Sequence, residues 1–93
     1  MDNKISNEKI DKYIDLTSRA LAQASNAIIK DKEKQAEEII SMVSNYLSDA
    51  KHFYQKGKWV DCFAALNYAH GWLDAGVRLD VFDVDDDSLF TVR

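Results

Sequence analysis

The sequence has 93 residues, of which 46% are hydrophobic and 30% are charged, so it fits one globular domain and excludes a disordered chain. The net charge is −4, and the basic residues are interleaved with acidic ones, as in KDKEKQAEE (residues 30–38), which argues against a protein that binds nucleic acid. No apolar run approaches the ~18 residues of a membrane span, and the first residues lack a signal-peptide pattern, so we expect a soluble cytoplasmic protein that does not bind membranes.

The first predicted helix spans about residues 6–29. Ser6 is a suitable N-cap residue, and Glu8 carries the charge that the positive end of a helix dipole favours. The apolar face has the three-and-four spacing of an amphipathic helix and consists of Ile10, Tyr13, Ile14, Thr17, Leu21, Ala24 and Ile28. We therefore expect this face to pack against other helices.

The second predicted helix spans about residues 33–56, and Gly57 is expected at the C′ position that ends it. Its apolar face consists of Ala36, Ile39, Ile40, Val43, Leu47, Ala50 and Tyr54. Residues 29–35 contain neither glycine nor proline, so one continuous helix of roughly 75 Å is an alternative to two helices. A turn is favoured, because the two apolar faces are out of phase there and Asp31 can cap a new helix.

The third predicted helix, at about residues 59–79, is apolar over most of its circumference, so it should contact two other helices. The centre of its apolar arc consists of Cys62, Ala65, Leu66, Ala69, Trp72, Leu73, Gly76 and Val77. A narrow polar strip remains, formed by Asn67, His70, Asp74 and Arg78 with Gly71 at its margin.

The last residues, 80–93, alternate acidic and apolar groups, and an acidic tail with this much apolar character should pack on the helices. The apolar residues of this tail are Val81, Phe82, Val84, Leu89, Phe90 and Val92. The sequence therefore predicts a single all-α domain over residues 1–93, an up-and-down bundle of three helices with a short acidic C-terminal tail packed on it.

The two glycines inside the third helix invite different explanations. Gly76 lies on the apolar face, where a missing side chain lets another helix approach closely. Gly71 lies beside the polar strip, where either the tail crosses the helix or a ligand or partner approaches its backbone. The polar strip is therefore the predicted ligand-binding or partner-binding site, with the residues Asn67, His70, Gly71, Asp74 and Arg78.

No complete catalytic set, metal site or cofactor motif is found, so no catalytic residue, metal or cofactor is assigned. His70 and Asp74 provide only half of a metal site. The acidic tail matches the start of a calcium loop, but Ser88 stands where the turn glycine belongs. Cys62 is the single cysteine, which excludes an internal disulfide, and its place on the apolar face indicates a small buried hydrophobe.

Two motifs and a turn glycine stand out in the second half of the chain. They are Tyr-x-x-Asp-Ala-x-x-Phe from Tyr46 to Phe53, then Gly57, then Tyr-Ala-x-Gly-Trp-Leu-Asp-Ala-Gly from Tyr68 to Gly76. With these elements, residues 46–82 resemble a small archaeal family catalogued as domain of unknown function 357. The resemblance implies a left-handed, up-and-down three-helix bundle, and it implies no activity because none is assigned to that family.

Two classes of function fit the sequence. The first is a non-catalytic protein–protein interaction module or small homo-oligomer, which the wide apolar arc of the third helix favours. The alternative is a small-molecule or nucleotide-binding protein that uses the polar strip. In that case Asp74 would accept hydrogen bonds, Arg78 would hold an anion, Gly71 would permit close approach, and His70 would be the one group able to transfer a proton.

Overall fold

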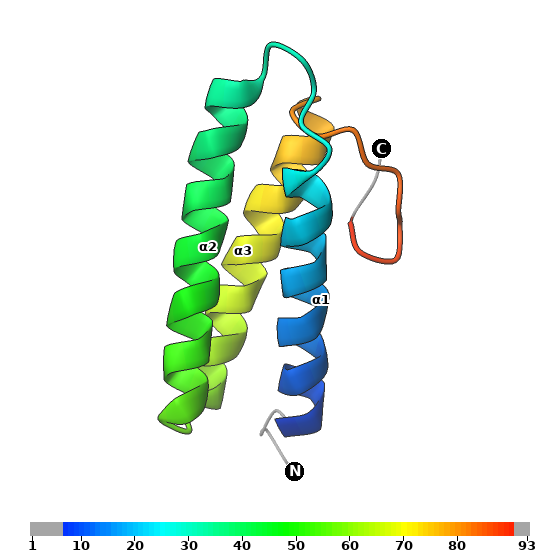
Figure 1. The fold of residues 1–93 in the computed structure, drawn as a ribbon. Coiled ribbons are helices and arrows are strands. Elements are labelled where there is room, and N and C mark those ends of the chain that lie inside the picture. The colour runs from blue at the N-terminus through cyan, green and yellow to red at the C-terminus, as the bar shows by residue number, and fades with distance from the viewer. Residues whose placement is uncertain (1–6, 91–93) are drawn as a thin grey trace.

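The computed structural model describes residues 7–90, which contain three helices, α1 (Asn7–Ser25), α2 (Glu33–Gln55) and α3 (Trp59–Arg78). The helices run up, down and up beside one another (Figure 1). The molecule is elongated, with extents of 47 × 22 × 16 Å. The predicted all-α bundle of three helices is confirmed. Ser6, the predicted N-cap, lies outside the described residues.

The connection between α1 and α2 differs from the prediction in two respects. The first helix ends at Ser25 rather than near residue 29, because the chain then turns and Ile28 forms an antiparallel β-bridge to Phe82. Asp31 does not cap α2, since it has a left-handed backbone (φ 73°) and Lys32 occupies the N-cap position without a side-chain hydrogen bond. A turn rather than one continuous helix therefore separates the first two helices.

The connection between α2 and α3 is a tight turn at Gly57, as predicted. Gly57 has a φ of 72°, a backbone conformation that favours glycine over any residue with a side chain. Its N–H donates to the carbonyl of Tyr54 at 3.1 Å, and the N–H of Lys58 donates to the carbonyl of Phe53 at 2.9 Å. This pair of hydrogen bonds is a Schellman motif, which satisfies the last carbonyls of α2.

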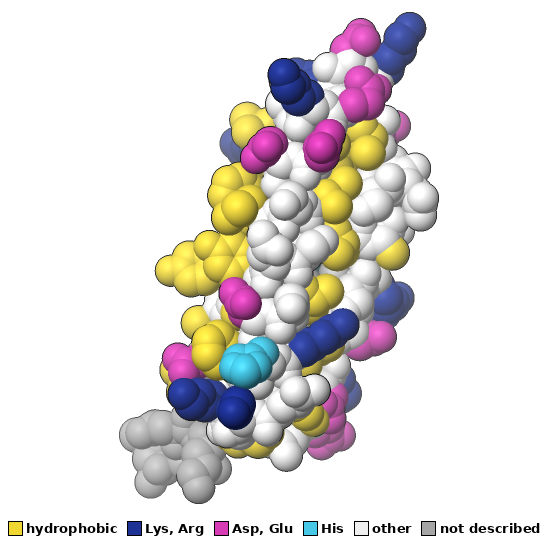
Figure 2. All heavy atoms as spheres, turned by 60° about the vertical axis from the view of Figure 1, so that its left-hand side comes forward, with side chains coloured by type: hydrophobic (Ala, Val, Ile, Leu, Met, Phe, Trp, Pro, Cys, Tyr) yellow, Lys and Arg dark blue, Asp and Glu magenta, His cyan; other side chains and the backbone are white. Residues whose placement is uncertain are grey.

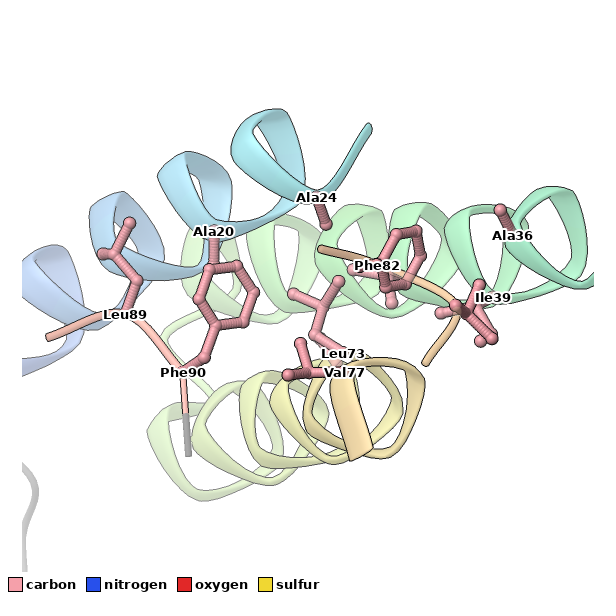
Figure 3. Close-up of a cluster of buried hydrophobic side chains, with 12 residues drawn as sticks. Ala20, Ala24, Ala36, Ile39, Leu73, Val77, Phe82, Leu89 and Phe90 are labelled. Atoms are coloured by element: carbon pink, nitrogen blue, oxygen red, sulfur yellow. The ribbon is translucent and has the colours of Figure 1, made fainter. Parts of the chain in front are cut away.

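The core is divided along the bundle axis into two clusters. The cluster near the α2–α3 turn contains Ile10, Leu47, Ala50, Cys62, Ala65 and Leu66. The cluster at the opposite end joins all three helices to the C-terminal segment, which we define as residues 79–90 (Figure 3). That segment inserts its side chains Val81, Phe82, Leu89 and Phe90 into the second cluster. The C-terminal segment is therefore part of the core.

The ring of Phe82 explains why residue 76 is a glycine. Phe82 is fully buried, and a Cβ atom on Gly76 would lie 2.5 Å from its Cε2 atom and 3.1 Å from the Cδ1 atom of Ile39 in α2. The predicted reason, close approach of another helix, is incomplete, because the nearest group is an aromatic ring that follows α3 in the chain. Figure 3 shows this ring between the ribbons of the helices.

Backbone hydrogen bonds fasten the C-terminal segment to the α1–α2 connection. The N–H of Ile29 donates to the carbonyl of Val81 at 2.9 Å, and the N–H of Asp83 donates to the carbonyl of Ala27 at 2.8 Å. These bonds satisfy backbone groups at a place where no helix supplies partners. They also hold Phe82 at the end of the bundle.

Candidate functional site

The structure separates the five residues of the predicted polar strip. His70 and Asp74 point towards α1 and the C-terminal segment, where they line a recess with residues of both. Gly71 lies on another side of α3, beside Tyr68, Trp72 and Ala75. Asn67 accepts a hydrogen bond from Tyr13 of α1 and also lies beside Gly71. Arg78 is exposed at the end of α3. The strip therefore contributes to two surfaces.

The first surface is a recess of about 250 Å³, which we call the polar recess. It is lined by Tyr13 and Leu16 from α1, by His70 and Asp74 from α3, and by residues 87–90 of the C-terminal segment. Two carboxylates, those of Asp74 and Asp87, are among the lining groups, so the recess has an acidic character. Its walls come from three separate parts of the chain.

His70 is the most unusual group of the polar recess. Its side chain is buried, with 8% exposed, and its ring stacks on the ring of Tyr13 at a centroid distance of 5.0 Å. The Nε2 atom is buried and makes no hydrogen bond. Burial lowers the pKa of His70 below its ordinary value of 6.5, because desolvation disfavours the imidazolium, and the nearby carboxylate of Asp74 opposes this effect.

Tyr13 completes the contact between α1 and α3. Its hydroxyl donates a hydrogen bond to Oδ1 of Asn67 at 2.8 Å. Burial and the charge of Asp74 raise the pKa of Tyr13, so the phenol stays protonated and can donate. The predicted strip residue Asn67 is thus held by a contact between helices.

We expect His70 to make the protein less stable in mild acid. Because its pKa is lower in the folded chain than the ordinary 6.5, the unfolded chain binds the proton more tightly, and the free energy of unfolding falls as the pH drops below about 6.5. The groups facing His70 are Tyr13 from α1, Asp74 from α3 and Asp87 from the C-terminal segment. Urea unfolding of the wild type and of His70→Gln at pH 7.5 and 5.5 measures the effect. If the free energy of unfolding falls equally in the wild type and in His70→Gln between pH 7.5 and 5.5, this prediction is wrong.

The second surface is the exposed side of α3, which borders α2 at Tyr46. Four large apolar side chains are exposed along it and just beyond its end, Val60 (71%), Tyr68 (62%), Trp72 (38%) and Leu79 (67%). We call this the α3 outer face and define it as Val60, Ala64, Tyr68, Trp72, Ala75 and Leu79. These residues recur every three or four positions, the spacing of one helical face. In Figure 2, hydrophobic side chains gather along the left-hand edge of the molecule.

A shallow hollow of about 350 Å³ lies at the middle of the α3 outer face. Its walls include Tyr68 and Trp72, and Gly71 leaves it open, because a Cβ atom at that position would meet no atom within 4 Å. Among the described residues, the C-terminal segment therefore does not cross α3 at Gly71, whereas Val92 of the predicted tail lies outside the described residues.

The hollow continues towards α2. The ring of Tyr68 stacks on that of Tyr46 with centroids 5.4 Å apart. Beyond these rings lies a second hollow of about 230 Å³, whose lining includes Asp49 and Asp61. The α3 outer face is thus a long apolar surface with acidic groups near the start of α3.

Two residues lie elsewhere than the sequence predicts. Trp72, placed at the centre of the buried arc, is 38% exposed, and His70, placed on the polar strip, is buried. The reason is that α1 and the C-terminal segment cover the polar side of α3, which turns the aromatic side outward. Tyr13 contacts His70 and Asn67, whereas the sequence predicts only a core position for it, since nothing in its sequence surroundings distinguishes it from a core residue.

Cys62 is fully buried, and burial raises the pKa of its thiol, so its environment is that of a small hydrophobe. Within residues 7–90, no three His, Cys, Asp or Glu side chains are grouped closely enough to bind a metal ion. None of the helices in that range has the length and apolar character needed to cross a membrane.

Comparison with known proteins identifies a family for this chain. A search of curated proteins and a search of solved structures each find no match. The family model described as "Protein of unknown function (DUF357)" matches residues 12–82, which is more than half of the chain. The match includes α2, α3, most of α1 and Phe82. The chain therefore belongs to this family.

Proposed function

We propose that this protein is a non-catalytic protein–protein interaction module and that the α3 outer face is its docking surface. The observation that carries the proposal is the exposure of four large apolar side chains along one side of α3 and at its C-cap residue, Leu79. Isolated exposed hydrophobic residues are common, but a continuous row of them, aromatic at its centre, is typical of binding surfaces.

The charge pattern of α3 supports the same conclusion. A helix side that faces water normally carries charged residues. Along the α3 outer face, charged side chains occur only near the two ends, at Asp61 and Arg78. Tyr68 and Trp72 lie between them, and aromatic residues at the centre of an interface supply much of its binding energy.

The test is affinity capture from a lysate of the source cells with three baits. They are the wild type, the variant Tyr68→Ser/Trp72→Ser, and the control Ile28→Ser, which removes an exposed apolar side chain (37%) that does not belong to the α3 outer face. We expect the same protein to be retained by the wild type and the control and lost by the double variant. Equal retention by all three folded baits would refute the assignment of the docking surface.

A second candidate function is small-molecule binding in the polar recess. It is favoured by the buried, unpartnered Nε2 atom of His70 in the wall of an acidic recess. Arg78, the predicted anion-binding group, does not line this recess, whereas Asp74 and Asp87 do. The recess is therefore better suited to a small protonated amine than to a nucleotide.

A thermal-shift comparison tests the second candidate with putrescine and AMP as probes. We expect putrescine to raise Tm in the wild type and to have a smaller effect on Asp74→Asn, while AMP changes neither. A rise with AMP alone, or no rise with either probe, would exclude binding of a protonated amine in the polar recess.

A further inference from the structure

We propose that the α3 outer face binds the same face of a second copy of this chain, with the two α3 helices antiparallel and related by a two-fold axis. The inference rests on the proposed function, because it names the partner that the docking surface binds. Such an interface is isologous, so every contact occurs twice, and one favourable pair of residues contributes at two places.

The apolar side chains of α3 are distributed symmetrically about one point of the helix. In an antiparallel helix pair, residues equally far before and after the two-fold axis face each other. With the axis at the level of residues 69–70, Tyr68 faces Trp72 of the second copy, and Ala64 faces Ala75. The pairs therefore join aromatic to aromatic and small to small residues.

The shape of the α3 outer face is compatible with this pairing of residues. Ala64, Gly71 and Ala75 have little or no side chain, so the two helix backbones can approach to the short end of the usual 8–10 Å range. The hollow of about 350 Å³ at Gly71 is open and bordered by Trp72. It has room for the ring of Tyr68 from the second copy, and stacked aromatic rings contribute beyond the area that they bury.

The charges select the antiparallel orientation. Asp61 lies near the start of the α3 outer face and Arg78 near its end. Antiparallel pairing brings the Asp61 end of one copy to the Arg78 end of the other, whereas parallel pairing would place like charges together. The dipoles of the two helices also attract when they are antiparallel and repel when they are parallel.

The size of the α3 outer face determines how tightly we expect the two copies to bind. A standard interface buries about 800 Å² on each partner, roughly an eighth of the 6135 Å² surface of this chain. The α3 helix has 20 residues and is about 30 Å long, and the outer face is one helix wide with Tyr46 at its flank. We therefore expect a reversible dimer that dissociates on dilution.

Sedimentation equilibrium from about 1 to about 500 µM tests the dimer, since this range spans the Kd expected for a small interface. We expect a monomer–dimer equilibrium in the wild type and in Ile28→Ser. In Tyr68→Ser/Trp72→Ser, shown to be folded by circular dichroism, Kd should rise at least about thirtyfold, as for the loss of central interface residues. A double variant that dimerises like the wild type would overturn the proposal.

Cysteine cross-linking tests the orientation. The double variant Ala64→Cys/Ala75→Cys should form a covalent dimer under mild oxidation, because residue 64 of one copy faces residue 75 of the other. Each single variant should form no covalent dimer, since its two cysteines would lie about 16 Å apart along the helices. Cys62 is fully buried, so we expect no cross-link through its thiol. Cross-linking of the single variants would show a parallel or different pairing and overturn the proposal.

The two proposals can fail separately. A wild type that stays monomeric throughout the concentration range overturns self-association. The capture experiment then decides the proposed function, because a different protein lost only by Tyr68→Ser/Trp72→Ser keeps the docking surface and changes its partner. A monomeric wild type whose captured proteins are unaffected by these substitutions removes both proposals.

Discussion

Replacing Phe82 by alanine is expected to lower the free energy of unfolding by about 3–5 kcal/mol, which for a domain of this size lowers Tm by at least about 12 °C. The ring is fully buried and belongs to the cluster that joins all three helices to the C-terminal segment. Its removal leaves a cavity that rigid helices can fill only in part. A domain of this length has a total stability of about 5–15 kcal/mol, so the substitution removes a large fraction of it.

The matched control for Phe82→Ala is Leu79→Ala, three residues earlier in the C-terminal segment. Leu79 is 67% exposed, and the substitution should change stability by less than about 0.5 kcal/mol. Both are measured by urea unfolding at low protein concentration, so that self-association does not contribute. Equal effects of the two substitutions would show that Phe82 does not anchor the core.

Alanine substitutions at the two glycines inside α3 are expected to change stability in opposite directions. Gly71→Ala should stabilise the chain by up to about 1 kcal/mol, because alanine favours a helix and its Cβ would meet no atom within 4 Å. Gly76→Ala should destabilise it by about 1–2 kcal/mol. Alanine again favours the helix, but the new Cβ would lie 2.5 Å from the Phe82 ring, and the resulting strain costs more than the helix propensity gains.

A double-mutant cycle isolates the cause of the Gly76→Ala effect. In the background Phe82→Leu, which replaces the colliding ring by a smaller and more adaptable side chain, Gly76→Ala should cost less than in the wild type. Unfolding by urea at low protein concentration gives all four free energies. An unchanged cost in this background would indicate that Ile39, at 3.1 Å, or the helix backbone causes the strain instead.

The positions of the helices could be predicted from the sequence because each has strong local signals. Gly57 ends α2 where a left-handed residue is required, and the apolar positions of α2 recur with helical spacing, so its start and end are predicted within one residue. The end of α1 was predicted four residues too late, because the Ile28–Phe82 bridge that stops it involves a residue 54 positions further along the chain.

The candidate site could be predicted only in part. The sequence marks Asn67, His70 and Asp74 as polar positions of α3, but it does not show that α1 and the C-terminal segment cover them. The apolar arc of α3 is so wide that helical periodicity cannot tell its covered side from its open side. Helical spacing therefore places Trp72 in the core, although the path of the chain leaves it exposed.

Because of the hydrogen bonds between the α1–α2 connection and the C-terminal segment, two amides far apart in the sequence should exchange their hydrogens in the same opening event. The N–H groups of Ile29 and Asp83 are 54 residues apart, yet both are protected from exchange only while the α1–α2 connection stays paired with the C-terminal segment. Native-state hydrogen exchange should therefore give them the same opening free energy, lower than that of the helical core around Leu73. Phe82→Ala should accelerate both amides equally, so this end of the bundle is expected to open as one cooperative unit while the helices stay folded.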